Sequence, residues 1–114
     1  LESFMKEDHL YLTKNLLLGP VCNRIGITQP DLSRLIKANT GKNFNQYVNG
    51  YRVRYAVSKL HEPGFLNKYS LNTLSDLCGF ASNASFYRAF RKETDTTPVS
   101  YYENVVISKK GNVI

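Results

Sequence analysis

The sequence has few cysteines, no tryptophan and a single methionine among its 114 residues. The two cysteines, Cys22 and Cys78, lie far apart, and neither has a cysteine or histidine nearby at the spacing of metal ligands. This pattern argues against a disulfide framework and against a zinc site. We therefore expect both cysteines to be small buried residues, and we expect no bound metal.

Long apolar runs are also absent, and none approaches the roughly 20 residues of a membrane-spanning helix. The first residues, LESFMKEDHL, lack the basic and then apolar layout of a signal peptide. The sequence therefore predicts a soluble, cytoplasmic protein that makes no membrane contact. Because it begins without methionine, we expect it to be part of a longer chain.

Residues placed for catalysis are scarce. His9 and His61 are solitary, no serine or cysteine nucleophile stands beside an acid, and there is no glycine-rich phosphate loop. These absences argue against an enzyme, and we expect no cofactor.

Acidic residues are in short supply. Asp and Glu total 9 against 15 Lys and Arg, which gives a net charge of +6 and an isoelectric point near 9.4. This balance favours a polyanionic partner. The alternative is a basic surface that only keeps a small domain soluble. The positions of the basic residues have to decide between these two interpretations.

The sequence does have helical periodicity along most of its length, with glycine and proline between the periodic segments. The pattern predicts helices at about residues 2–10, 18–25, 29–40, 44–61, 71–78, 83–94 and 98–106. The stretches LTKN and EPGFLNKY are expected to connect helices, and the tail SKKGNVI is expected to be frayed. The predicted fold class is therefore all-α, with seven helices and no sheet.

An internal repeat divides the chain. At an offset of 53, the residues Leu18, Val21, Cys22, Ile25, Gly26 and Ile27 correspond to Leu71, Leu74, Ser75, Cys78, Gly79 and Phe80. After one inserted residue, Ala81, the offset is 54, and Thr28, Leu32, Arg34, Ile36, Thr40 and Tyr47 correspond to Ser82, Phe86, Arg88, Phe90, Thr94 and Tyr101. Each copy predicts a short helix, a glycine turn, a capped second helix and the start of a third.

Each copy has the pattern of a helix-turn-helix. The apolar stripes of its two helices can be buried only against each other and against a third helix. Cys22 and Ser75 occupy the same slot, where a small side chain lets the second helix cross closely. Gly26 and Gly79 supply the left-handed backbone conformation of a sharp turn.

Cap residues mark the start of both second helices. Thr28 is expected to cap the first, Asp31 to complete a capping box, and Pro30 to be tolerated in the first turn. Ser82 is expected to cap the matching helix, where Ser85 stands in the place of an acid.

The second helices are expected to present hydrogen-bonding and cationic side chains to solvent. These are Gln29, Ser33, Arg34 and Lys37 in the first copy, and Asn83, Ala84, Ser85, Tyr87, Arg88, Arg91 and Lys92 in the second. Most can bind base edges or phosphates. Arg34 and Arg88 hold equivalent places and could each grip a guanine. The alternative is a surface arginine paired with an acid, and Asp31 lies one turn from Arg34.

The segment NFNQYVNGYRVRYAVSKL predicts a connecting helix of about 18 residues, roughly 27 Å long. Two recognition helices held this far apart could enter successive major grooves, which recur at about 34 Å. One chain would then read an asymmetric site. We expect the isolated fragment to be a monomer. No segment forms a heptad seam, so the sequence does not indicate the oligomeric state of the parent protein.

The stretch SLNTLSDLCGFASNASFYRAFRKETDTTPVSYY resembles the signature of the AraC-type family of bacterial transcription regulators. Upstream, GITQPDLSRLIKANTGKNFNQYVNGYRVRYAVSKL is similar to the first helix-turn-helix and connecting helix of the same family. The resemblance covers about residues 9–102. It implies one DNA-binding domain over residues 1–114, at the end of a longer regulator. Within it we expect a first helix-turn-helix at 9–43, a connecting helix at 44–62 and a second helix-turn-helix with a closing helix at 70–106.

The resemblance also implies the partners and roles of the matching positions. Base contacts would fall to Gln29, Ser33, Arg34, Asn83, Ala84, Ser85 and Arg88, and backbone contacts to Lys37, Lys42, Tyr87, Arg91 and Lys92. The expected partners are double-stranded promoter or operator DNA and RNA polymerase. Pro30 stands where the family often has a base-facing side chain, so the first recognition helix is expected to carry less sequence information. A protein-interaction module remains the competing hypothesis, and salt dependence of binding would separate the two.

Overall fold

The computed structural model describes residues 5, 9–14 and 16–107. Its helices are the 3-10 turn η1 (Leu10–Leu12), α2 (Leu18–Ile25), α3 (Gln29–Thr40), α4 (Phe44–Leu60), α5 (Phe65–Lys68), α6 (Leu71–Leu77), α7 (Asn83–Thr94), α8 (Pro98–Tyr101) and the π-helix η2 (Tyr102–Ile107). Within these residues there is no strand. The all-α prediction is therefore confirmed.

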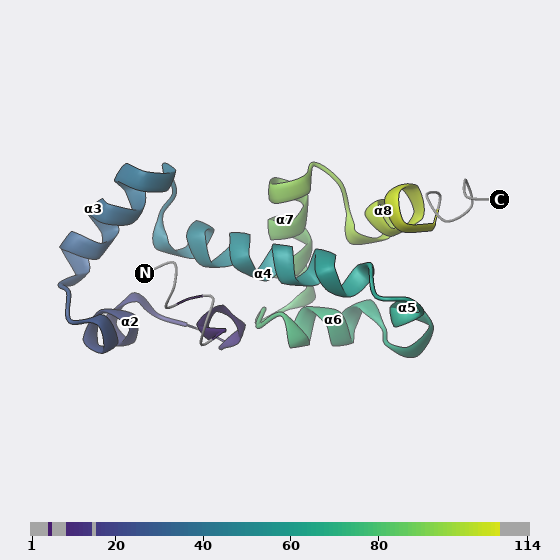
Figure 1. Ribbon diagram of the computed structural model, residues 1–114, viewed down its shortest axis with the longest axis horizontal. Helices are drawn as coiled ribbons and strands as arrows, with labels where there is room; N and C mark the ends of the chain where they lie inside the picture. Colours follow the sequence, from purple (N-terminus) through teal and green to yellow (C-terminus); the bar gives the residue numbers. More distant parts are fainter. Residues whose placement is uncertain (1–4, 6–8, 15, 108–114) are drawn as a thin grey trace.

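Helix α4 forms the long axis of an elongated molecule of 53 × 25 × 25 Å. Figure 1 shows the pair α2–α3 at one end of α4 and the pair α6–α7 further along it. Helices α3 and α7 are well separated along the long axis, as the sequence predicts for two recognition helices. With 17 residues, α4 is roughly 26 Å long.

Two hydrophobic cores lie on this common helix. Phe44, Val48 and Tyr51 of α4 pack into the core of the first unit, around Leu32 and Ile36 of α3. The second core joins the C-terminal half of α4 to the second unit, through the buried residues Val53, Ala56, Leu60, Leu74, Phe86 and Phe90. Each helix pair therefore buries its apolar stripes against α4, which is the third helix that both stripes require.

The repeat is visible in the turns. The turn of the first unit closes with a 3.2 Å hydrogen bond from Ile27 N to Cys22 O, and the second with a 3.2 Å bond from Phe80 N to Ser75 O. Cys22 and Ser75 are both buried, as predicted for small residues beneath a crossing helix. Both turn glycines, Gly26 and Gly79, have a positive φ, of 74° and 88°.

The same correspondence extends past the recognition helices. Thr40 Oγ1 and Thr94 Oγ1 each donate to the carbonyl oxygen four residues back, both at 2.7 Å. The helices that follow begin with equivalent caps, because Asn43 accepts from Gln46 N and Thr97 accepts from Ser100 N. Asp95 ends α7 in the left-handed conformation with φ 61°, as Gly41 ends α3 with φ 72°.

The caps of α3 and α7 follow the prediction in part. Thr28 Oγ1 accepts from Asp31 N, and Ser82 Oγ accepts from Ser85 N. The Asp31 side chain bonds to the side chains of Thr28 and Arg34 instead of the Thr28 backbone N–H, so the capping box predicted at α3 is incomplete. A full box occurs at the start of α4, between Asn43 and Gln46.

The N-terminal segment His9–Lys14 crosses α4 and touches both units. Arg52 of α4 donates from Nε to Tyr11 O at 2.6 Å and from a terminal nitrogen to Thr13 O at 2.7 Å. Tyr11 packs in the first core, whereas Lys14 pairs with Asp76 of α6. Most of the helix predicted at 2–10 lies outside the described residues; at its end, Leu10 begins the turn η1.

Two other predictions are wrong in detail. The linker before α6 contains a short helix, α5, because Phe65 is buried in the second core and orders the chain around it. The predicted closing helix at 98–106 is divided into α8 and the π-helix η2. In the part of the chain that the structure describes, no helix has both the length and the apolar character needed to span a bilayer.

Candidate nucleic-acid interface

Helix α3 presents the predicted polar face to solvent. Leu32 and Ile36 are buried, and this orientation leaves Gln29, Ser33, Arg34 and Lys37 exposed. A hollow of about 310 Å³ lies on this face, lined by Ser33, Arg34, Lys37, Asn43 and Phe44. Hydroxyl, guanidinium and ammonium groups therefore surround one concave patch, and these are groups that bind phosphate or base edges.

Arg34 has a partner on its own helix. Its guanidinium donates to Asp31 Oδ1, and hydrogen bonds from Thr28 and Arg34 lower the pKa of the Asp31 carboxyl. Both partners are exposed, so the pair is weak and can exchange for a stronger acceptor. The alternative considered for Arg34, a surface arginine paired with an acid, describes its state without DNA.

Helix α7 presents a larger polar face. Phe86, Ala89 and Phe90 are buried, and on the rest of the helix Asn83, Ala84, Tyr87, Arg88, Arg91 and Lys92 are exposed while Ser85 is half-buried. Because 3.6 residues make one turn, Arg88 and Lys92 lie on one side of the helix, about one turn apart. The face is cationic towards its C-terminal end.

Arg88 differs from Arg34 in having no ion-pair or hydrogen-bond partner among the residues that the structure describes. The first turn of α7 is more constrained. Asn83 Nδ2 donates to Asn72 Oδ1 of α6, and Ser85 donates its backbone N–H to the capping Ser82. The Arg88 guanidinium is thus free to bind an acceptor outside the domain without breaking an existing contact.

Tyr87 lies at the edge of this face. It is exposed to 40%, and its ring meets Phe86 edge-on at 5.8 Å between centroids. The Tyr87 ring can pack against Phe86 while the side chain stays partly exposed, so Tyr87 can contact a sugar or phosphate from this position.

Lys42 does not lie free on the predicted surface. Its Nζ is 3.2 Å from Glu93 Oε1, and Glu93 is in the last turn of α7. This ion pair connects the two units, and sequence spacing offered no signal for it because the partners are 51 residues apart.

A second hollow, of about 340 Å³, lies between the two units and includes Ser85, Ala81 and Phe80 in its lining. Helix α4 contributes Asn45 and Asn49 to it, and Arg52 approaches the Phe80 ring at 5.4 Å. Neither amide was among the contacts predicted from the sequence. The signal that could have found them is the polar pair at i and i+4 within an amphipathic helix.

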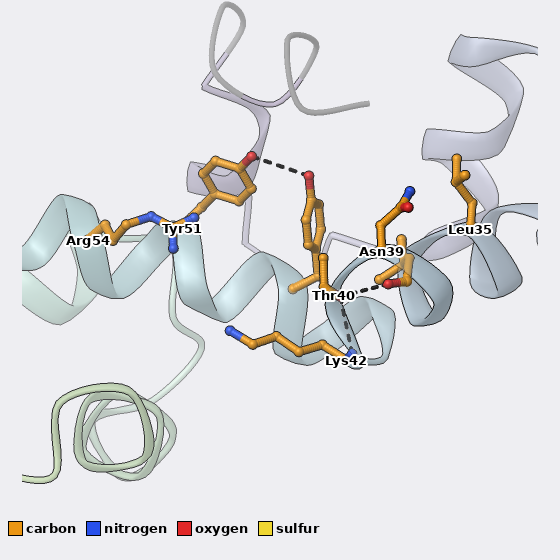
Figure 2. A pocket seen from close by; sticks show the side chains of 8 residues that line it. Leu35, Asn39, Thr40, Lys42, Tyr51 and Arg54 are labelled. Carbon is orange, nitrogen blue, oxygen red and sulfur yellow. Dashed lines mark hydrogen bonds between the residues drawn. The ribbon is translucent and has the colours of Figure 1, made fainter.

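A third hollow, of about 490 Å³, lies on another side of the first unit. Its lining includes Leu35, Asn39, Lys42, Tyr47, Tyr51 and Arg54. Figure 2 shows Leu35 and Asn39 on α3, and Tyr51 and Arg54 on α4. The hydroxyl oxygens of Tyr47 and Tyr51 are 3.2 Å apart. Around α3, Leu35 lies roughly opposite Ser33 and Lys37, so this groove faces away from the polar patch.

The described residues hold no cluster of three or more metal-ligating side chains. Cys22 and Cys78 are buried free thiols, and burial raises the pKa of the Cys78 thiol to about 12.

The candidate site consists of two polar, cationic helix faces, on α3 and α7, that are related by an internal repeat. This architecture defines the class: a DNA-binding domain with two helix-turn-helix units.

Comparison with known proteins identifies the family within that class. A family model described as "Helix-turn-helix domain" matches residues 21–104, and the chain belongs to this family, the AraC-type regulators. The family is one of DNA-binding transcription regulators and not of enzymes.

Two relatives and one solved structure illustrate the likeness. The probable transcription factor PqrA of Proteus vulgaris is 29% identical over 98 residues, which cover 86% of this chain and 77% of that protein. The xylose operon regulatory protein of Escherichia coli K12 is 28% identical over 88 residues, covering 77% of this chain and 21% of that protein. The DNA-binding domain of the global transcriptional factor AdpA, solved in complex with a target DNA, has the same fold. Its TM-score is 0.70 at 22% identity, and the match covers 85% of this chain and 82% of that one.

The chain spans about a fifth of the length of the xylose operon regulator that it matches. By contrast, it spans most of PqrA.

Proposed function

We propose that this domain binds double-stranded DNA with α3 and α7 in successive major grooves on one face of the duplex. The observation that carries the proposal is the repeat itself, which places equivalent polar faces on two helices separated along α4. A helix pair of this kind inserts its second helix into the major groove, and adjacent grooves recur at about 34 Å.

The proposed roles follow the exposed side chains. Base contacts are assigned to Gln29, Ser33, Arg34, Asn83, Ala84, Ser85 and Arg88. Backbone contacts are assigned to Lys37, Lys42, Tyr87, Arg91 and Lys92. Lys42 is paired with Glu93, Asn83 with Asn72 and Arg34 with Asp31, so at these three positions DNA would have to replace an internal partner.

The second unit is proposed to supply more of the sequence discrimination. Arg88 is unpaired in the described part of the chain, whereas Arg34 must leave Asp31 to reach a base. Pro30 has no side-chain donor and lies exposed in the first turn of α3. Fewer bidentate contacts are therefore open to the first recognition helix.

For the whole protein we propose a cytoplasmic transcription regulator in which this domain is the C-terminal part and acts as a monomer on DNA. Its units would be residues 9–43, 44–62 and 70–106, in agreement with the positions of α2–α3, α4 and α6–η2. The printed names of the relatives, a xylose operon regulator and a probable transcription factor, support such a role.

RNA polymerase is the further partner that we propose. The candidate surface is the 490 Å³ groove of Figure 2, which faces away from the polar patch of α3 and includes Leu35, 44% exposed. The change Leu35→Asp should reduce retention of RNA polymerase on promoter DNA bound by the domain, and should leave DNA affinity unchanged. Equal retention by the variant and the native domain would exclude this surface.

The test of the proposed function is selection of bound sequences from a random DNA pool. We expect one asymmetric site with two conserved blocks, centred about 10–11 base pairs apart, because one helical turn separates the grooves. A pool that shows no enrichment at low salt would exclude sequence-specific binding. A single enriched block would restrict the proposal to one recognition helix.

A further inference from the structure

Two ion pairs of the described residues join the helix-turn-helix units: Lys14–Asp76, through the N-terminal segment, and Lys42–Glu93, at the ends of the recognition helices. Lys42 lies in the turn between α3 and α4, and its Nζ is 3.2 Å from Oε1 and 3.5 Å from Oε2 of Glu93. Glu93 is in the last turn of α7, and its side chain is only 22% exposed against 39% for Lys42. The ends of the two recognition helices are therefore connected by a partly buried contact.

The contact lies over a glycine of the connecting helix. A Cβ atom on Gly50 would be 3.5 Å from Lys42 Nζ, 3.6 Å from Glu93 Oε1 and 3.7 Å from a terminal nitrogen of Arg54. Gly50 is buried in the middle of α4 and has no positive φ, so the backbone does not require glycine there. All three distances are ordinary contact distances, so two cations and a carboxylate converge over this glycine without requiring it. Figure 2 shows Lys42 extending along α4 on the side of Arg54.

The cluster is not part of the repeat. At the offset of 54 residues, Lys42 corresponds to Thr96, and Glu93 corresponds to Asn39. These counterparts are not charged, so no equivalent ion pair can form at the other positions. The ion pair connects the two units, and it is not part of the packing that each unit has in common with the other.

We propose that the Lys42–Glu93 pair sets the position of the two recognition helices relative to each other, and so the half-site spacing that the domain accepts. The inference rests on the proposed function, in which both helices bind one duplex. Each unit packs on its own half of α4, and rocking of a unit on that helix would change the distance between α3 and α7. The ion pair resists this rocking because it bridges the two units beyond the packed surfaces.

Lys42 is then a positioning residue in place of the backbone contact assigned to it above, and its effect is distinct from that of a phosphate contact. A lost phosphate contact weakens binding at every spacing by the same factor. A lost positioning contact lowers the penalty for a wrong spacing. This penalty is the loss of DNA affinity at a shifted spacing, and it can fall by no more than the interaction free energy of the ion pair. For a partly exposed pair, that free energy corresponds to about a two- to fivefold change in affinity.

The experiment measures dissociation constants for the selected site and for two sites with the half-sites moved one base pair closer or further apart. The readout is the ratio between shifted and selected sites. We expect Glu93→Gln and Lys42→Gln each to reduce this ratio by about two- to fivefold. The double variant Lys42→Glu with Glu93→Lys, which reverses the pair, should restore the native ratio.

The matched control is Glu62→Gln. It makes the same change of charge and breaks an ion pair of similar length, Lys59–Glu62 at 3.1 Å, but that pair lies within one stretch of chain and bridges no units. The ratio should stay at its native value in this variant. Thermal unfolding of every variant confirms that the fold is retained.

Three results would overturn the inference. One is an unchanged ratio in Glu93→Gln. Another is a uniform loss of affinity in Lys42→Gln at all three spacings, which would make Lys42 a phosphate contact. The third is failure of the reversed pair to restore the ratio. Failure of the native domain to select any DNA would instead overturn the proposed function, and the inference with it.

Discussion

Arg88 and Arg34 occupy equivalent positions in the repeat but differ in their surroundings. Arg34 pairs with Asp31, whereas Arg88 has no partner among the described residues. Residue type and helical phase were enough to predict that both are exposed. The partner of Arg34 was foreseen because it lies one turn away, but the partner of Lys42 was not, because it lies on another helix.

The change Arg88→Ala should relax base preference at one position of the selected site and weaken binding by about 1–3 kcal/mol, because a bidentate contact to guanine is lost. Lys92→Ala should instead weaken binding to all sequences similarly. Titrations against the selected site and its single-base variants distinguish the two effects. If Arg88→Ala left both affinity and base preference intact, its assigned role would be wrong.

Cys78 provides a pH-dependent measurement. Burial raises the pKa of its thiol from 9.0 to about 12, so the folded chain keeps the proton at pH values where the unfolded chain releases it. Stability from this residue is present below pH 9 and is lost as the pH rises towards 12. Between about pH 8 and about pH 10.5 we expect a loss of about 2 kcal/mol in the free energy of unfolding.

Urea unfolding of the native chain and of Cys78→Ala at both pH values isolates the contribution of this thiol. The variant should lose less stability than the native chain over the same interval. Equal losses would indicate a thiol that ionises as readily in the folded state as in the unfolded state.

At the scale of the elements, the repeat provides matched sites with different surroundings. Gly26 and Gly79 occupy the same turn position, and both have a left-handed backbone conformation. A Cβ on Gly26 would meet nothing within 4 Å, but a Cβ on Gly79 would lie 2.6 Å from the carbonyl oxygen of Leu12. The backbone of the N-terminal segment therefore lies against Gly79 and not against Gly26.

We predict that Gly26→Ala lowers the free energy of unfolding by about 1–2 kcal/mol, through backbone strain alone. Gly79→Ala should cost about 1–3 kcal/mol more, because the added methyl group must displace the backbone of Leu12. Denaturant unfolding of the two variants gives both values. Equal losses would mean that the N-terminal segment does not press on this turn in solution.

Helix boundaries were predicted well where local signals were strong. Periodicity and caps placed α2, α3 and α7 at their observed bounds, with glycine or Asp95 ending each helix in the left-handed conformation. Short elements were missed because their stability is tertiary: α5 has four residues and depends on the burial of Phe65. The capping box at Asn43 and Gln46 was present in the sequence but was overlooked.

At the scale of the whole molecule, charge decides how the domain meets its partner. The net charge is +6, and the cations proposed to meet phosphates are Lys37, Lys42, Arg91 and Lys92. If Lys42 remains paired with Glu93, three of these cations are available to bind phosphates. Binding should then depend on salt through the counterions that these groups release.

We expect the logarithm of the DNA association constant to fall with the logarithm of salt concentration at a slope of about −3 to −4. Fluorescence anisotropy of the selected site, titrated at several salt concentrations, measures this slope. A slope near zero would favour the competing hypothesis of a protein-interaction module held by apolar contacts.

The sequence by itself determined the all-α fold, the duplicated helix-turn-helix and the exposed faces of α3 and α7. These features depend on local periodicity, caps and glycine turns, which are encoded by residues within a few positions of one another. Only the tertiary structure decided how the two units are joined. The contacts of Arg52 with the N-terminal segment and of Lys42 with Glu93 span about forty to fifty residues, and such contacts leave no periodic signal in the chain.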